Sequence, residues 1–225
     1  WGTDPTNFGW AVGTMGGGAL SVSAGRDVLN LSAATADGGQ AANGVLTEYG
    51  GGPLSVSAGR NVDTGFFYVA EGQGSIQAGG ALGSDVTDPS TRLQLGTMLA
   101  LGSSQITTRA RGPVEIASAL NPTIIGQPQA SGAPLFLTFT DTSALDVESE
   151  SGTVRIVANN SSTGSFLTPA VVSGSGLTAT HVFPASLTVR AFGGDINLNK
   201  AGIFLYPSPT GQLDLYATGS ILDGQ

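Results

Sequence analysis

One thirteen-residue stretch occurs twice in this chain. GGGALSVSAGRDV, Gly16 to Val28, returns 34 positions later as GGGPLSVSAGRNV, Gly50 to Val62. A chain that makes the same local shape repeatedly builds units that bury their apolar faces by stacking on one another. This repeat therefore constrains the fold more than any other feature of the sequence.

The core of the repeat alternates apolar and polar residues and ends on a small residue. Alternation with a period of two predicts strands with one buried and one solvated face. The residues between the apolar positions are mostly polar, as in Ser21 and Ser23. The predicted copies are Leu20/Val22/Ala24, Leu54/Val56/Ala58, Val154/Ile156/Ala158, Leu187/Val189/Ala191 and Leu213/Leu215/Ala217, with weaker ones at Ile76/Ala78 and Val114/Ile116/Ser118.

A glycine commonly follows the last alanine, and a second short strand follows the glycine. Examples are DVLNL after Gly25 and GDINL after Gly193. Glycine suits a sharp corner because it adopts positive φ without strain. Strand, corner and strand in repetition predict an all-β chain folded as a parallel β-helix, a solenoid of about 7 to 9 coils with a length of about 35 to 45 Å.

Other repeat folds fit less well. An antiparallel sandwich needs hairpin turns, and ANGV at Ala42 to Val45 holds the one clear Asn-Gly. Helical solenoids require a 3.6-residue period, and calcium-binding rolls require G-G-x-G-x-D, and neither pattern is found.

The irregular spacing of the copies predicts loop excursions from a single domain spanning 1–225. The expected excursions are residues 127–134 and 159–176, whose roles the sequence leaves open. The chain opens without a signal-peptide pattern and closes within a repeat, so we expect a segment of a longer protein.

Charge and composition exclude several classes of function. The net charge is −8 with 8 Lys+Arg, which disfavours nucleic acid as a partner because phosphate binding requires basic clusters. The absence of Cys rules out disulfides and thiolate metal sites.

The ordered succession of GGALSVSAGRDV, RGPVEIASALNPT, SGTVRIVANN, ASLTVRAFGGDINL and IFLYPSPTGQLDLYATGSI resembles filamentous haemagglutinin-like exoproteins over about Gly16 to Gly224. These are β-helical surface proteins secreted by the two-partner route, including relatives of contact-dependent inhibition effectors. The resemblance implies a right-handed β-helix, an outer-membrane partner pore for the parent protein, and adhesion to a host or neighbouring cell surface or glycan.

Candidate chemistry is sparse. Among the acids Asp141, Asp146, Glu148 and Glu150, the last two are expected to lie about 7 Å apart on one strand face, a spacing that fits an acid and a base. Alternating acids on a solvated face, without a basic or aromatic neighbour, are the simpler interpretation.

Corner residues can also be assigned structural roles. Asp27, Asn61 and Asp195 are expected to bond turn backbone rather than a cation. Arg26 and Arg60 are expected to form ion pairs with acids such as Asp27.

The remaining polar and aromatic candidates are isolated. His181 is the one histidine and is interpreted as a loop residue. Phe66 to Tyr68 and Trp1 with Trp10 are interpreted as core or isolated surface aromatics, and Asn159 and Asn160 as weak glycosylation signals.

We therefore predict no catalytic, cofactor-binding or metal-binding residues and no cofactor. The predicted function is a non-catalytic shaft segment of a secreted bacterial surface adhesin or filament. The alternatives are a fibre subunit that self-associates by stacking coil on coil, and a carbohydrate-active β-helix enzyme.

Overall fold

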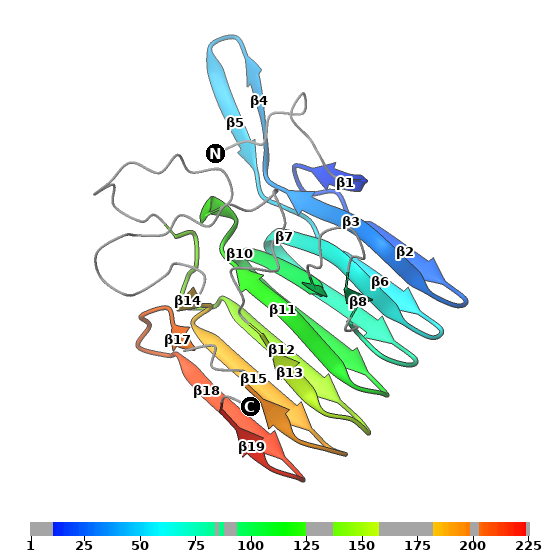
Figure 1. The fold of residues 1–225 in the computed structure, drawn as a ribbon. Helices are drawn as coiled ribbons and strands as arrows, with labels where there is room; N and C mark the ends of the chain where they lie inside the picture. The colour runs from blue at the N-terminus through cyan, green and yellow to red at the C-terminus, as the bar shows by residue number, and fades with distance from the viewer. Residues whose placement is uncertain are drawn as a thin grey trace.

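The computed structural model describes residues 11–83, 86–87, 94–124, 137–157, 182–198 and 203–223. These form an all-β structure dominated by one thirteen-stranded sheet, in which every strand pairing is parallel. The all-β prediction is confirmed, and the parallel pairing is consistent with a β-helix. Figure 1 shows successive strands lying side by side from the N-terminal to the C-terminal end.

The strands of the large sheet are β1 (Val12–Met15), β2 (Leu20–Ala24), β3 (Val28–Ala36), β6 (Leu54–Ala58), β7 (Val62–Ala78), β10 (Thr97–Ala110), β11 (Val114–Leu120), β12 (Ala144–Ser149), β13 (Val154–Ile156), β15 (Ser186–Ala191), β16 (Ile196–Asn197), β18 (Gln212–Ala217) and β19 (Ile221–Leu222). Three two-stranded sheets accompany it: β4 (Gly38–Ala42) with β5 (Val45–Tyr49), β8 (Val86–Thr87) with β9 (Gln94–Leu95), and β14 (Val182–Phe183) with β17 (Phe204–Leu205). A short 3-10 turn, η2, spans Pro122–Ile124.

The repeated motif forms what we call the first ladder: β2, β6, the ends of β7 and β10, β12, β15 and β18. Its inward residues, most of them apolar, stack in register in three columns. These are Leu20, Leu54, Gly74, Ile106, Leu145, Leu187 and Leu213; Val22, Val56, Ile76, Thr108, Val147, Val189 and Leu215; and Ala24, Ala58, Ala78, Ala110, Ser149, Ala191 and Ala217. The inward residues of the central strands are buried, which confirms the predicted alternation.

A second ladder begins after each corner, with the column Val28, Val62, Leu82, Val114, Val154, Ile196 and Ile221. Val114 and Val154 belong to this column, so their predicted assignment to the Leu20 motif is wrong. The first-ladder members at those levels begin at Ile106 and Leu145. These two segments do not match the sequence motif. In the first, Thr108 stands at the second apolar position, and in the second, Ser149 stands at the alanine position. The hydroxyl of buried Thr108 donates to the Asp146 carbonyl at 3.3 Å, and that of Ser149 to the Gly112 carbonyl at 2.8 Å.

Glycine is required at the corner for a different reason from the one expected. Gly59 and Gly79 do not have positive φ. Instead, a Cβ at Gly59 would lie 2.2 Å from the Gly25 carbonyl oxygen, and one at Gly79 would lie 2.3 Å from that of Gly59. The close approach of successive backbones therefore excludes any side chain at these positions.

The Asx residues at the corner bond backbone, as predicted, but in the next level of the ladder rather than in their own turn. Asn61 N–H donates to Asp27 Oδ1 at 3.1 Å, Ala81 N–H to Asn61 Oδ1 at 2.9 Å, and Ser220 N–H to Asp195 Oδ1 at 2.7 Å. The side chain of Ala81 offers no acceptor, and the residue that follows it in this column is Pro113, which has no N–H to satisfy.

The predicted ion pair at this corner is also confirmed, because the Arg60 guanidinium bonds the Asp27 carboxylate. This hydrogen bond is the largest of the influences that hold the pKa of Asp27 below its ordinary value.

The antiparallel hairpin β4–β5 projects from the sheet near its N-terminal end (Figure 1). Its turn residues Asn43 (φ 52°) and Gly44 (φ 77°) give the two-residue turn that suits a twisted hairpin. The single Asn-Gly of the sequence therefore marks an excursion from a parallel sheet. Val45 and Leu46 on this hairpin are more than half exposed.

The aromatic run near the start of β7 is divided between core and surface. Phe67 is completely buried, in register with Ala33 of β3 and Leu99 of β10, whereas Phe66 and Tyr68 are partly exposed. Alternation along the strand gives this division, so the run is mainly a packing feature.

We predict that Asn61→Ala lowers the free energy of unfolding by about 1 kcal/mol, because the Ala81 N–H loses its acceptor. Ala81→Asn is the matched control and should change stability by less than about 0.5 kcal/mol, since Pro113 provides no donor. Urea unfolding followed by circular dichroism measures both. Equal losses in the two variants would contradict the assigned role of the corner column.

Candidate functional site: the outward face of the first ladder

The outward side chains of the first ladder form a continuous polar face. Adjacent strands lie about 4.8 Å apart, so each column repeats at that spacing. The two columns are Ser21, Ser55, Ser75, Thr107, Asp146, Thr188 and Asp214, and Ser23, Ser57, Gln77, Arg109, Glu148, Arg190 and Tyr216. The N-terminal half is neutral, and the charges begin at Arg109.

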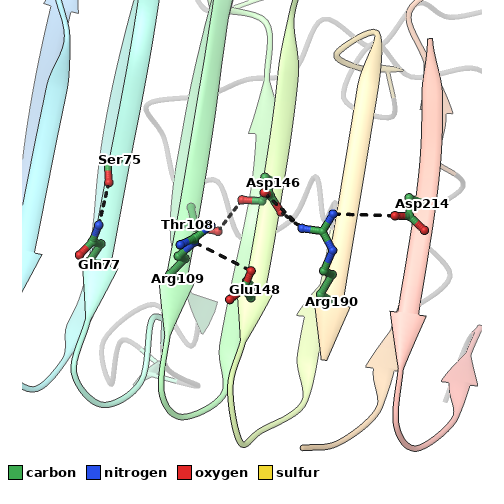
Figure 2. A network of polar contacts seen from close by, with 8 residues as sticks. All are labelled: Ser75, Gln77, Thr108, Arg109, Asp146, Glu148, Arg190 and Asp214. Carbon is green, nitrogen blue, oxygen red and sulfur yellow. Dashed lines mark hydrogen bonds and ion pairs between the residues drawn. The ribbon is translucent and has the colours of Figure 1, made fainter. Parts of the chain in front are cut away.

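The charged half alternates in sign across neighbouring strands (Figure 2). Arg190 lies between two aspartates: Nη1 is 3.3 Å from Asp146 Oδ1, and Nη2 is 3.9 Å from Asp214 Oδ2. Arg109 Nε lies 3.9 Å from Glu148 Oε2. The expectation that these acids lack a basic neighbour is therefore wrong. The arginines are distant in sequence and meet the acids only through strand register.

The predicted acid–base pair does not share a strand face. Glu148 lies in β12, whereas Glu150 follows the end of that strand at Ser149, and its N–H donates to the Ala110 carbonyl at 2.9 Å. The expected separation assumed an extended strand through both residues. The Oε2 atom of Glu148 also lies 3.9 Å from Nε of Arg109, across the two neighbouring strands.

The neutral half is a hydroxyl and amide surface with few charges. Ser57 Oγ donates to Ser23 Oγ across strands at 3.2 Å, and Gln77 Nε2 donates to Ser75 Oγ at 3.3 Å. These groups also retain capacity to bond water or a polar partner. The chemistry that this half offers is hydrogen bonding over a regular array.

An exposed aromatic pair lies at the C-terminal end of the polar face and was missed from the sequence. Phe192 and Tyr216 lie with ring centroids 5.6 Å apart at 50°, and Tyr216 is in register with Arg190. Aligning Ala191 with Ala217 would have placed Phe192, just after β15, near Tyr216 of β18. Aromatic rings beside charged hydrogen-bonding groups provide one apolar and one polar contact for a partner.

At the base of the β4–β5 hairpin, the carboxylate of Asp37 joins the segments before β4 and after β5. Gly51 N–H, just after β5, donates to Oδ1 of Asp37, just before β4, at 2.8 Å. Burial raises the pKa of Asp37, the Gly51 hydrogen bond opposes this, and Glu48 raises it further. Burial, followed by the charges of Asp37 and Glu71, also raises the pKa of Tyr68.

Buried Asn121, just after β11, joins two segments of the chain through its side-chain amide. Its Oδ1 accepts hydrogen bonds from Thr123 Oγ1 at 2.7 Å and from Thr138 N–H and Oγ1 at 3.2 Å, while its Nδ2 donates to the Leu101 carbonyl at 3.4 Å. Thr123 and Thr138 flank the predicted excursion at 127–134. A buried amide thus fixes the two flanks of this segment.

Several predicted features lie outside the described residues. They are the two excursions at 127–134 and 159–176, His181, Trp1, Trp10, Asn159, Asn160 and Ala158.

Within the described ranges, no group of three His, Cys, Asp or Glu side chains is arranged to hold a metal ion. The same residues include no helix with the length and apolar character that a membrane crossing demands. Comparisons with protein-family models, curated proteins and solved structures give no match.

We predict that Arg190→Met destabilises the fold by about 0.5–1 kcal/mol at low salt, because two ion pairs are lost while the aliphatic stem is kept. The difference from the parent chain should shrink in 1 M NaCl, where exposed ion pairs are screened. Urea unfolding at both salt concentrations tests this. A loss that is independent of salt would assign the effect to packing instead.

We predict that Asp37→Asn raises stability at pH 7 by about 0.5 kcal/mol, because the amide keeps an acceptor for Gly51 and removes a half-buried charge. Because the pKa of Asp37 is raised in the folded state, its contribution to the free energy of unfolding is fully present below pH 3.8. This contribution is lost as the pH rises through the folded-state pKa. The advantage of the variant should therefore disappear near pH 3. Thermal melts from pH 3 to 7 measure it.

Asp27→Asn is the control with the opposite sign. The pKa of Asp27 is lowered in the folded state, so its contribution to the free energy of unfolding is present above pH 3.8. This contribution is lost as the pH falls through the folded-state pKa. This variant should be less stable than the parent at pH 7. A gain in stability for both variants would indicate a general effect of net charge.

Proposed function

We propose that this chain is a segment of a right-handed parallel β-helical shaft in a secreted bacterial surface adhesin or filament. The observation that carries the proposal is the in-register stacking of the first ladder over seven levels, from Leu20 to Leu213. Each level covers the backbone and apolar residues of the next, which is the physical requirement for a stiff, extensible support.

The proposed action is adhesion or display rather than catalysis. Two described surfaces support it. The β4–β5 hairpin extends away from the sheet with Val45 and Leu46 exposed, and the Phe192–Tyr216 pair lies at the edge of the polar face. Aromatic rings flanked by hydrogen-bonding side chains suit a glycan, so we propose a cell-surface glycan as the partner of this face.

The proposed route to the cell surface uses an outer-membrane partner pore that acts on the parent protein. The resemblance of the repeats to filamentous haemagglutinin-like exoproteins supports this part of the proposal. The net charge of −8 supports a partner other than nucleic acid.

Immunogold labelling of intact cells, followed by negative-stain electron microscopy of the material released from their surface, tests the proposal. We expect external label on thin rods of uniform width. Label confined to the cell interior, or compact particles of about this chain's mass, would contradict the shaft.

Glycan binding is tested separately on the purified chain with Tyr216→Ser. We expect weaker retention on a cell-surface glycan array for this variant and unchanged retention for Tyr49→Ser, which alters a tyrosine of similar exposure on the hairpin. Equal retention of both variants would remove the aromatic pair as the contact. Turnover of polysaccharide that is lost in Glu148→Gln would favour the enzyme alternative.

A further inference from the structure

The turn of the β4–β5 hairpin contains the one asparagine of the sequence that a glycine follows. Asn43 and Gly44 both have positive φ, at 52° and 77°, and both are exposed. A two-residue turn of this kind requires positive φ at both positions, which explains why an asparagine and a glycine stand there. The same two residues also bring together two groups that react with each other.

These groups are the side-chain amide carbon of Asn43 and the backbone nitrogen of Gly44. A bond between the nitrogen and Cγ closes a five-membered ring, and a reaction within one residue pair avoids the entropy cost of bringing two molecules together. Glycine favours the closure because it has no side chain to obstruct the approach of its nitrogen. Among the described residues, none forms a hydrogen bond with the Asn43 side chain, so its amide carbon is open to attack.

The surroundings of the turn leave it free to change conformation. Ring closure requires rotation of the Asn43 backbone away from the turn geometry. Apart from its chain neighbours, no heavy atom lies within 4 Å of a Cβ placed at Gly44, and β4 and β5 pair only with each other among the described residues. A two-stranded hairpin is marginally stable and opens locally at a small cost in free energy. The turn therefore reaches the reactive geometry while the first ladder stays folded.

Two other asparagines are protected from this reaction by their contacts and by the residue that follows. Asn61 accepts the Ala81 N–H at 2.9 Å through its side chain, and it precedes Val62, whose branched side chain is stiff. Asn121 is buried, and Pro122 after it has no N–H that could lose a proton to give a nucleophile.

Asn30 provides the best-matched comparison. It is exposed and has a positive φ of 50°, as Asn43 does, but the residue that follows it is Leu31. Asn197 also precedes a leucine, and it lies in β16 within the large sheet. A leucine side chain obstructs the approach of the backbone nitrogen to Cγ. Among the described asparagines, exposure, conformational freedom and an unhindered nucleophile coincide at Asn43.

We propose that Asn43 is a site of spontaneous covalent modification, at which asparagine converts to aspartate and isoaspartate without an enzyme. The Gly44 nitrogen loses its proton to hydroxide and attacks Cγ of Asn43, the bond from Cγ to the side-chain nitrogen breaks, and ammonia leaves. Water then opens the ring at one of its two carbonyl carbons. Cleavage between Cγ and the Gly44 nitrogen gives aspartate, and cleavage between the Asn43 backbone carbonyl carbon and that nitrogen gives isoaspartate.

Isoaspartate changes the hairpin, whereas aspartate preserves it. In isoaspartate the backbone runs through Cγ, so the turn gains one methylene group and a free carboxylate. The turn then no longer places Ala42 opposite Val45. Aspartate keeps the normal backbone and, like asparagine, tolerates positive φ. The modification follows from the turn alone, goes beyond the proposed surface role and does not depend on it.

Incubation of the purified 225-residue chain at neutral and at mildly alkaline pH tests the proposal. Peptide mass spectrometry measures conversion at each asparagine, and methyl transfer by an isoaspartate-specific methyltransferase identifies the product. We expect Asn43 to convert about tenfold or more faster than Asn30 in the same sample. Conversion should accelerate as the pH rises, because the attacking nitrogen must first lose a proton.

Gly44→Ala separates the chemistry from the flexibility of the turn. Alanine at a φ of 77° strains the turn and loosens the hairpin, but its methyl group hinders the attacking nitrogen. We expect conversion at Asn43 to be slower in this variant by about tenfold, although its hairpin opens more readily.

Freshly purified Asn43→Asp is the matched control for the structural effect. Its β5 amides should keep the protection from hydrogen exchange that they have in the fresh parent chain. In the aged parent chain, the isoaspartate-containing fraction should lose this protection, while the first ladder keeps its own.

Three outcomes would overturn the proposal. The first is an Asn43 that stays unmodified or converts no faster than Asn30. The second is a Gly44→Ala variant that converts as fast as the parent or faster, which would assign the rate to hairpin opening. The third is unchanged exchange protection of β5 in chains shown to contain isoaspartate, which would show that the turn does not depend on a normal backbone at Asn43.

Discussion

The close in-register contact between successive backbones is the constraint on which the rest of the structure depends. At the corner, the carbonyl of one level lies where the next level would place a Cβ, so Gly59 and Gly79 have no alternative. The same contact brings each Asx side chain within reach of the next backbone N–H. Packing, hydrogen bonding and the choice of small residues at the corner are therefore consequences of one spacing.

This contact tolerates irregular lengths because only the ladder segments must match. Extra residues are inserted between the ladder segments. At two of these insertions, a side chain bonds the two flanks of the inserted segment to each other. Asp37 joins the base of the β4–β5 hairpin through Gly51, and Asn121 joins Thr123 to Thr138. A polar side chain that bonds backbone or side-chain groups on the far side of the extra segment fixes such a junction without adding another strand.

The polar face shows how register assigns electrostatic partners. Arg190 meets Asp146 and Asp214 because the three residues occupy adjacent levels, although more than twenty residues separate neighbouring members in the chain. A shift of one residue in either strand would move these side chains to the interior. The alternating charges thus favour the observed register, while the neutral half leaves a surface of hydroxyls and amides.

The sequence alone predicts the all-β class, the alternation of buried and exposed residues, and the recurrence of Leu-x-Val-x-Ala before a corner. These follow from local periodicity, which a single segment carries. It could not assign Val114 and Val154 to the second ladder, or recognise Ile106 and Leu145 as first-ladder residues. Nor could it bring Arg109 to Glu148. Those pairings depend on excursions of unequal length, and only the tertiary structure decides which distant segments share a level.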